Sequence, residues 1–141
     1  MIDSSRTFTT APFEDSETLH IAIEDLKPRP KERARNAKER IVNGRLIKAH
    51  MYTPKATREY ETQLKWHFRL AVKNPWTGPL VVMIRFTTRS RADADNLAKA
   101  VLDGGNKVLY DDDAQVTTLI TEKVRGKREI IELWMKRKAD G

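Results

Sequence analysis

The chain has 141 residues, a net charge of +7 and no cysteine, and 33% of its residues are charged. Its length fits one domain with one hydrophobic core, and the lack of cysteine excludes disulfide frameworks and thiolate metal or redox sites. No segment reaches the ~18 apolar residues that a membrane-spanning helix needs, and the acidic, hydroxyl-rich first residues are unlike a signal peptide. We therefore expect a cytoplasmic protein without a membrane partner.

The positive charge is concentrated between residues 27 and 48. This segment holds nine Lys and Arg residues against two Glu residues, so it accounts for the whole net charge of the chain. Such a segment attracts polyanions, of which nucleic acid is the commonest in a cell. A solvated loop or a charged helix face would have a similar composition, so charge by itself leaves both interpretations open.

The chain begins with a segment that lacks apolar periodicity. Residues 1–17 are rich in Ser, Thr, Asp and Glu, which predicts a flexible N-terminal arm and leaves residues 18–141 as the folded domain. In TLHIAIEDL, residues 18–26, apolar and polar side chains alternate. This alternation predicts a half-buried strand as the first element of the domain.

The basic segment and a helix come next. Pro28 and Pro30 lack backbone donors and hold the chain extended, so they predict an extended segment or loop that displays its basic side chains. Thr53 followed by Pro54 is typical of a helix start, and apolar residues then recur at helical spacing until Asn74-Pro75. The sequence therefore predicts a helix over about 54–73.

The second half of the chain alternates strands with one helix. GPLVVMIRFTT, residues 78–88, predicts a strand near the centre of a sheet. The next helix is expected over about 94–108, although Gly104-Gly105 weakens its end. Two strands near 114–124 and 128–136, with a glycine turn between them, predict a hairpin. Together these elements predict an α+β fold, a single domain with a mixed β-sheet flanked by helices.

Two carboxylates stand one residue apart at the start of this helix. Asp93 and Asp95 lie in SRADADNLAK, where they could serve helix structure alone. Ser90 with Asp93 resembles a capping box, acids are favoured near a helix N-terminus, and Asp95 with Lys99 has the spacing of an i, i+4 ion pair. The D-x-D pair by itself is therefore weak support for a metal site.

A second acidic cluster favours the metal interpretation. Asp111, Asp112 and Asp113 follow one another, and a turn would need only one of these repelling charges. Oxygen ligands without cysteine suit Mg²⁺ or Mn²⁺, which assist phosphodiester hydrolysis. If the helix is a crossover between strands, its two ends need not be close, so the sequence does not show whether Asp113 meets Asp93 and Asp95.

The two acidic clusters together resemble a known family. RADADNLAKAVLDGGNKVLYDDDAQV, residues 91–116, is similar to the motif of the RusA family of Holliday junction resolvases: D-x-D-N-L-x-K, an Asp four residues after the Lys, then D-D-A-Q-V. The stretches KPRPKERAR, residues 27–35, and YTPKATREYE, residues 52–61, are similar to the proline-and-basic stretch and helix start of many phage and prophage members.

The resemblance implies a homodimeric endonuclease that binds four-way DNA junctions by their shape and nicks two strands symmetrically. It implies Mg²⁺ or Mn²⁺ and no small-molecule cofactor. It assigns the metal-binding catalytic carboxylates to Asp93, Asp95 and Asp113, and the catalytic lysine to Lys99. Contacts to DNA phosphates are expected from the basic residues Lys27, Arg29, Lys31, Arg33, Arg35, Arg89 and Arg91.

Two other classes of function fit parts of the sequence. A non-catalytic DNA-binding protein would need only the basic segment 27–48, and its binding would require neither a divalent ion nor Asp93. A D-x-D nucleotide-sugar transferase would hold a metal against a diphosphate, but that class usually has a larger nucleotide-binding domain. The tryptophans Trp66, Trp76 and Trp134 fit core or interface packing better than stacking on unpaired bases.

Overall fold

A computed structural model describes residues 17–31 and 55–139, together with the backbone of four short strands between these two parts. β2 (Arg35–Ala37) pairs antiparallel with β5 (His50–Tyr52), and β3 (Arg40–Val42) pairs antiparallel with β4 (Arg45–Ile47). The predicted arm 1–17 lies outside the described residues except for its last residue, and Arg33 also lies outside them.

The domain is built on one mixed sheet with the strand order β1-β8-β6-β7. The strands are β1 (Leu19–Glu24), β6 (Leu80–Thr88), β7 (Val116–Arg125) and β8 (Ile130–Arg137). β6 runs parallel to β7 and antiparallel to β8, which in turn pairs antiparallel with β1. The apolar strand β6 therefore lies inside the sheet, as its sequence predicts.

The predicted hairpin between the last two strands is wrong. β7 and β8 both pair with β6, which lies between them, and they do not pair with each other. The connection between them passes the end of β6, where the Gly126 N–H donates to the Thr88 carbonyl at 3.4 Å. A Cβ at Gly126 would lie 2.6 Å from the Thr87 side chain. The glycine thus lets the chain cross close to β6 rather than make a tight hairpin turn.

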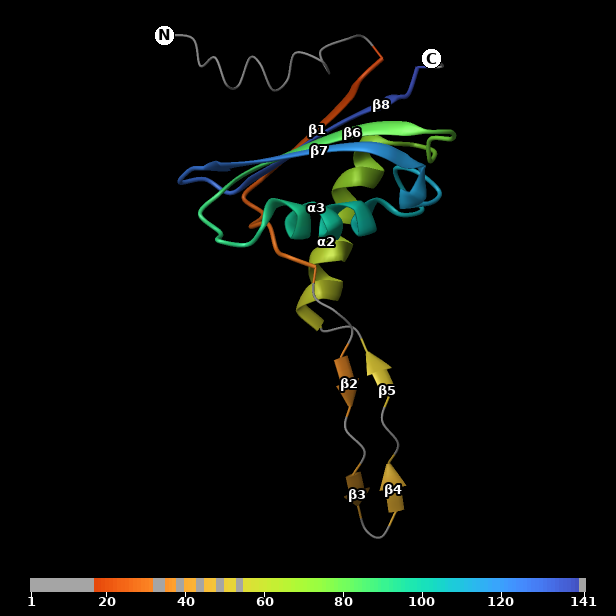
Figure 1. Cartoon of the computed structure of the whole chain (residues 1–141), viewed down its shortest axis with the longest axis vertical. Coiled ribbons are helices and arrows are strands. Elements are labelled where there is room, and N and C mark those ends of the chain that lie inside the picture. The colour runs from red at the N-terminus through yellow and green to blue at the C-terminus, as the bar shows by residue number, and fades with distance from the viewer. Residues whose placement is uncertain are drawn as a thin grey trace.

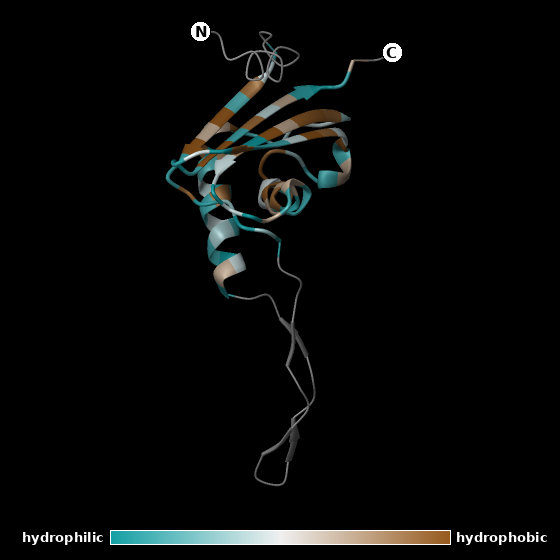
Figure 2. Ribbon diagram, turned by 60° about the vertical axis from the view of Figure 1, so that its left-hand side comes forward, coloured by the Kyte–Doolittle hydropathy of each residue, from teal (hydrophilic) through white to brown (hydrophobic). Residues whose placement is uncertain are grey.

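Two helices cover one face of this sheet (Figure 1). They are α2 (Lys55–Ala71) and α3 (Ala94–Gly105), and α3 connects the parallel strands β6 and β7 as a crossover. Apolar residues are frequent in the strands, and hydrophilic residues are frequent along α2 (Figure 2). The buried residues of α2 are Thr57, Tyr60, Leu64 and Phe68. The buried core combines the helices and this face of the sheet, with Tyr60, Leu64, Phe68, Ile84, Phe86, Leu97, Val101 and Leu133 among its members.

α3 ends at Gly105, short of the predicted end at about 108, and the two glycines at its end allow tight packing. A Cβ at Gly104 would lie 3.0 Å from the side chain of Leu64 on α2, and one at Gly105 would lie 2.7 Å from the Tyr110 hydroxyl. That hydroxyl donates to the Leu102 carbonyl at 2.6 Å. A larger side chain at either position would press on these neighbours, so the glycines allow Leu64 and Tyr110 to pack closely against the end of α3.

The opposite face of the sheet carries a cluster around Trp134. This side chain is buried and stacks on His20 at a ring distance of 4.7 Å. Arg85 lies 5.2 Å from the same indole and pairs with Glu122 at 3.1 Å. The predicted packing is thus found for Trp134, whereas Trp66 on α2 is 60% exposed in the single chain. No helix in the described part of the chain is long and apolar enough to cross a membrane.

Candidate active site

The D-x-D motif lies at the N-terminal end of α3, and Asp93 is the N-cap residue of this helix. Its backbone carbonyl accepts from the Leu97 N–H at 3.0 Å, but its carboxylate makes no capping hydrogen bond. Ser90 does not form the predicted capping box, because its hydroxyl accepts from the Ala92 N–H at 3.2 Å instead. The exposed Asp93 carboxylate therefore forms no hydrogen bond that closes the helix start.

The loop before Asp93 is held from two sides. The Thr88 hydroxyl at the end of β6 accepts from the Ser90 N–H at 3.0 Å. From β7, the Lys123 ammonium donates to the carbonyls of Ser90 at 3.3 Å and Ala92 at 2.8 Å. No short motif in the sequence pointed to Lys123, since its partners are backbone atoms of a distant loop. Together these bonds fix the backbone that carries Asp93.

Asp95 and Lys99 extend the same exposed surface of α3. Asp95 accepts from the N–H of Asn96 at 3.0 Å. The ion pairs among the described residues do not include the predicted pair of Asp95 with Lys99. Both side chains are exposed, so a carboxylate and an ammonium stay one turn apart and accessible to a phosphate.

Basic side chains border this end of α3. The extended segment after β1 contacts the first turn of the helix, where the Lys31 N–H donates to the Asn96 carbonyl at 3.2 Å. Lys27 and Arg29 on that segment are exposed, as are Arg89 and Arg91 in the loop before Asp93. Arg35 lies in β2, and its side chain is not among those described. Cations from two separate segments thus lie on the borders of the acidic pair.

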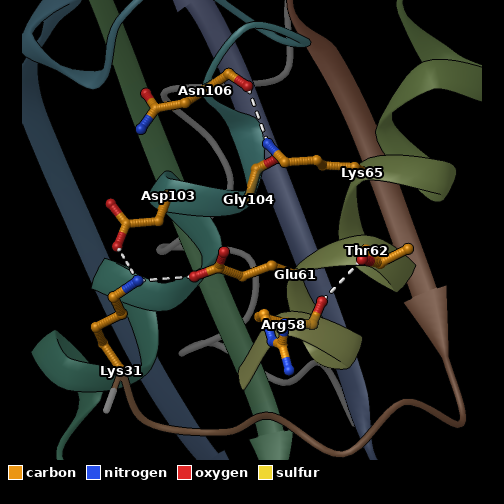
Figure 3. Close-up of polar contacts among 8 residues, drawn as sticks. All are labelled: Lys31, Arg58, Glu61, Thr62, Lys65, Asp103, Gly104 and Asn106. Carbon is orange, nitrogen blue, oxygen red and sulfur yellow. Dashed lines mark hydrogen bonds and ion pairs between the residues drawn. The ribbon is translucent and has the colours of Figure 1, made fainter. Parts of the chain in front are cut away.

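Lys31 has a different environment from the other predicted phosphate contacts. Its ammonium lies 2.7 Å from Glu61 of α2 and 2.9 Å from Asp103 of α3, bridging the two helices (Figure 3). Burial lowers the pKa of Lys31, but hydrogen bonds and charge from the two carboxylates outweigh burial and raise it. The Lys31 side chain is 26% exposed. Its ammonium thus has its partners within the domain, unlike the exposed basic residues predicted to contact phosphates.

The C-terminal end of α3 is also braced by α2. The Lys65 ammonium donates to the carbonyls of Gly104 at 3.1 Å and Asn106 at 3.0 Å, the latter shown in Figure 3. A cation here complements the negative end of the helix dipole. Burial lowers the pKa of Lys65. Lys65 of α2 and the ion pairs of Lys31 with Glu61 and Asp103 thus hold the C-terminal end of α3 against α2.

The second acidic cluster lies just beyond this C-terminal end. Asp112 caps the 3₁₀-helix η2 (Asp113–Gln115) by accepting from the Ala114 N–H at 3.0 Å. Gln115 accepts from the Asp112 N–H and donates to the carbonyl of Trp76 at 2.9 Å. The Asp113 N–H donates to the Asn106 side chain at 2.8 Å. Asp112 and the glutamine of D-D-A-Q thus serve the local fold and leave Asp113 as the candidate ligand.

The pKa values of Asp113 and Asp112 are shifted in opposite directions. Partial burial raises the pKa of Asp113, and hydrogen bonding and charge from Asp112 and Asp103 add to the effect. The neighbouring Asp112 has its pKa lowered, chiefly by the hydrogen bond from the Ala114 backbone. A cation close to Asp113 would relieve this repulsion, because an opposite charge favours the ionised form.

The two halves of the acidic motif lie at opposite ends of α3 (Figure 1). The helix has 12 residues, which corresponds to a length of about 18 Å. Asp93 and Asp95 are at its start, whereas Asp113 contacts Asp103 near its end. Among the described residues, no three His, Asp or Glu side chains are placed to hold one metal ion. One copy of the chain therefore does not bring the three predicted ligands together.

Exposed carboxylates beside basic side chains define a site suited to phosphodiester chemistry on nucleic acid. The family model of endodeoxyribonuclease RusA matches residues 25–135. This match covers most of the chain, and the chain therefore belongs to the RusA endodeoxyribonuclease family. Membership implies an endonuclease that acts on Holliday junctions, and the family predicted from the motif is confirmed. A search of curated proteins finds no match to the chain.

Proposed function

We propose that this protein is a homodimeric endonuclease that resolves four-way DNA junctions by symmetric paired nicks, with Mg²⁺ or Mn²⁺ as its cofactor. The observation that carries this proposal is the Asp93 carboxylate, which caps no backbone group although it occupies the N-cap position. A cap bond typically contributes about 1 kcal/mol to stability. A side chain placed here that makes no such bond is best explained by a role in binding or chemistry.

The residues at the start of α3 fit a hard divalent cation. Asp93 and Asp95 offer exposed carboxylate oxygens, and Mg²⁺ typically takes one or two protein carboxylates and completes its shell with water and substrate phosphates. When bound, such an ion makes water more acidic and offsets negative charge on the phosphate. Cysteine is absent, which agrees with an oxygen-ligand site.

The neighbouring cations would orient the DNA and stabilise charge that develops on the phosphate. Lys99 follows Asp95 by one helical turn and is exposed, so its ammonium can approach a phosphate held at the acidic pair. Arg89 and Arg91 in the adjoining loop would bind flanking phosphates, which gives affinity without reading sequence. These roles need no base contacts and agree with recognition of DNA by shape.

The separation of the acidic clusters leads us to assign Asp113 to the opposite site of the dimer. In one subunit, Asp113 lies about the length of α3 from Asp93 and Asp95. A two-fold dimer places the same surface of both subunits against each other, so the end of one α3 can meet the start of the other. Each site would then take Asp93 and Asp95 from one subunit and Asp113 from its partner.

A non-catalytic DNA-binding role is the second candidate, and the lack of a three-carboxylate cluster within the described part of one subunit favours it. Cleavage of a labelled synthetic junction in Mg²⁺, beside linear duplex of the same sequence, separates the two. The proposed function predicts paired nicks only in the junction, lost in Asp93→Asn while junction binding persists. Junction binding by wild-type protein without cleavage in Mg²⁺ or Mn²⁺ would leave the binding role alone.

A further inference from the structure

A cavity of about 510 Å³ lies between the extended basic segment, α2 and the loop that leads to Asp93. Its walls come from residues 26–30, from the first half of α2 and from Ser90. Ser90 precedes Asp93 by three residues, so the cavity opens beside the acidic end of α3. The phosphate contacts proposed above do not require a cavity at this place. Basic side chains that protrude from the protein surface are sufficient to bind the phosphates of a duplex.

The walls combine flat apolar surfaces with groups that form hydrogen bonds. Pro28, Pro30 and Ala56 supply apolar surface, and Gln63 supplies an amide that both donates and accepts. Tyr60 lies deeper, and its buried hydroxyl donates no hydrogen bond among the described residues. Burial raises the pKa of Tyr60 to about 12, although the Arg29 backbone N–H beside the hydroxyl and the charge of Arg29 oppose this. The hydroxyl thus stays neutral at physiological pH and retains an unused donor.

The charges around the cavity favour an anionic chain over a neutral ligand. Lys27 and Arg29 line the cavity on the side of the extended segment. An adjoining hollow of about 440 Å³ on α2 shares Glu59 and Gln63 with it and adds Lys55 and Arg58. Among the described residues, four cationic side chains therefore line the two adjoining hollows against one carboxylate. This pattern suits a strand whose phosphates run along these hollows.

We propose that this cavity binds one nucleotide extruded from a DNA strand, next to the phosphate that is cut. The proposal rests on the proposed action on branched DNA. A volume of about 510 Å³ lies within the range of sites for small organic ligands, and the base would lie between the proline surface and α2. Strands at a branch point are less well stacked than in duplex, so extrusion of a base is easier there.

Fluorescence of 2-aminopurine, placed in turn at each position of one junction strand near the branch point, tests this proposal in EDTA so that no strand is cut. Three proteins are compared: wild type, Ala56→Phe, which fills the cavity, and Ala71→Phe, a matched control at the exposed far end of α2. The proposal predicts that one position brightens several-fold with wild type and Ala71→Phe, and not with Ala56→Phe. It is overturned if no position brightens beyond the free junction, or if Ala56→Phe matches wild type.

An abasic site provides a second test that loss of folding cannot imitate. Ala56→Phe should bind the intact junction about 10-fold more weakly, the scale of losing one stacked base. An abasic residue at the brightened position should abolish this difference between Ala56→Phe and wild type, because neither protein then has a base to bind in the cavity, whereas an abasic residue elsewhere should leave the difference unchanged. Brightening without cleavage in Mg²⁺ or Mn²⁺ would support nucleotide binding in the cavity and refute the nuclease proposal. Cleavage without brightening would support the nuclease proposal and refute nucleotide binding in the cavity.

Discussion

Replacing Lys31 with Met distinguishes a structural lysine from a DNA contact. The ammonium is hydrogen-bonded to Glu61 and Asp103 at 2.7 and 2.9 Å, and the three side chains are 21 to 26% exposed. Hydrogen bonds to charged groups contribute about 1.5–3 kcal/mol each when buried, and exposed ion pairs about 0–1 kcal/mol. We expect Lys31→Met to lower the free energy of unfolding by about 2 kcal/mol, because it leaves two carboxylates without their shared cation.

Urea unfolding measures this difference directly, and the melting temperature should fall by roughly 8 °C. The pKa of Lys31 is raised in the folded protein from its ordinary value of 10.5, so its stabilisation is present in full below pH 10.5 and is lost as the pH rises through the folded value. The difference between wild type and Lys31→Met should therefore be constant near neutral pH and shrink above pH 10.5.

The matched control for this substitution is Lys27→Met, which removes an exposed lysine of the same segment. It should change stability by less than about 0.5 kcal/mol and weaken junction binding in a salt-dependent way. The reasoning would be refuted if Lys31→Met unfolded like wild type and instead reduced junction affinity as Lys27→Met does. Lys31 would then be the phosphate contact that the sequence predicted.

Three further predictions follow from contacts around α3. Asp93→Asn should abolish cleavage yet change the free energy of unfolding by less than about 0.5 kcal/mol, since its carboxylate makes no cap bond; a large loss of stability in urea would contradict this. Lys123→Met should raise the Mg²⁺ concentration for half-maximal cleavage about 10-fold, because it frees the loop before Asp93, whereas the exposed Lys127→Met should not. Gly105→Ala should destabilise the protein by about 1–3 kcal/mol, because the new Cβ meets the Tyr110 hydroxyl, and an unchanged urea midpoint would argue against this packing.

Local patterns in the sequence were sufficient to predict most elements of the fold. Alternation predicts β1, helical spacing predicts α2, and the apolar run predicts β6 as an inner strand, all of which the structure contains. The pairing of β7 with β8 was predicted wrongly, because strand partners depend on contacts far apart in the sequence. Both strands pair with β6 instead. A glycine turn between two strands does not show whether a third strand lies between them in the sheet.

The site was predictable in its residue types but not in its arrangement. The D-x-D motif and the aspartate run are visible in the sequence, yet their separation by the length of α3 follows from the crossover between two parallel strands. The roles of Lys31 and Lys123 depend on partners in other elements. The basic composition of residues 27–48 suggested one common role, and only the described contacts show that Lys31 differs from Lys27.

Junction cleavage by mixed dimers tests the proposed shared site most directly. One subunit carries Asp93→Asn with Asp95→Asn, the other carries Asp113→Asn, and the two are unfolded and refolded together beside wild type treated in the same way. If each site takes ligands from both subunits, each variant alone is inactive and the mixture regains nicking, because one of the two sites in a mixed dimer is intact. A mixture that stays inactive while refolded wild type cleaves would contradict the assignment of Asp113 to the partner's site.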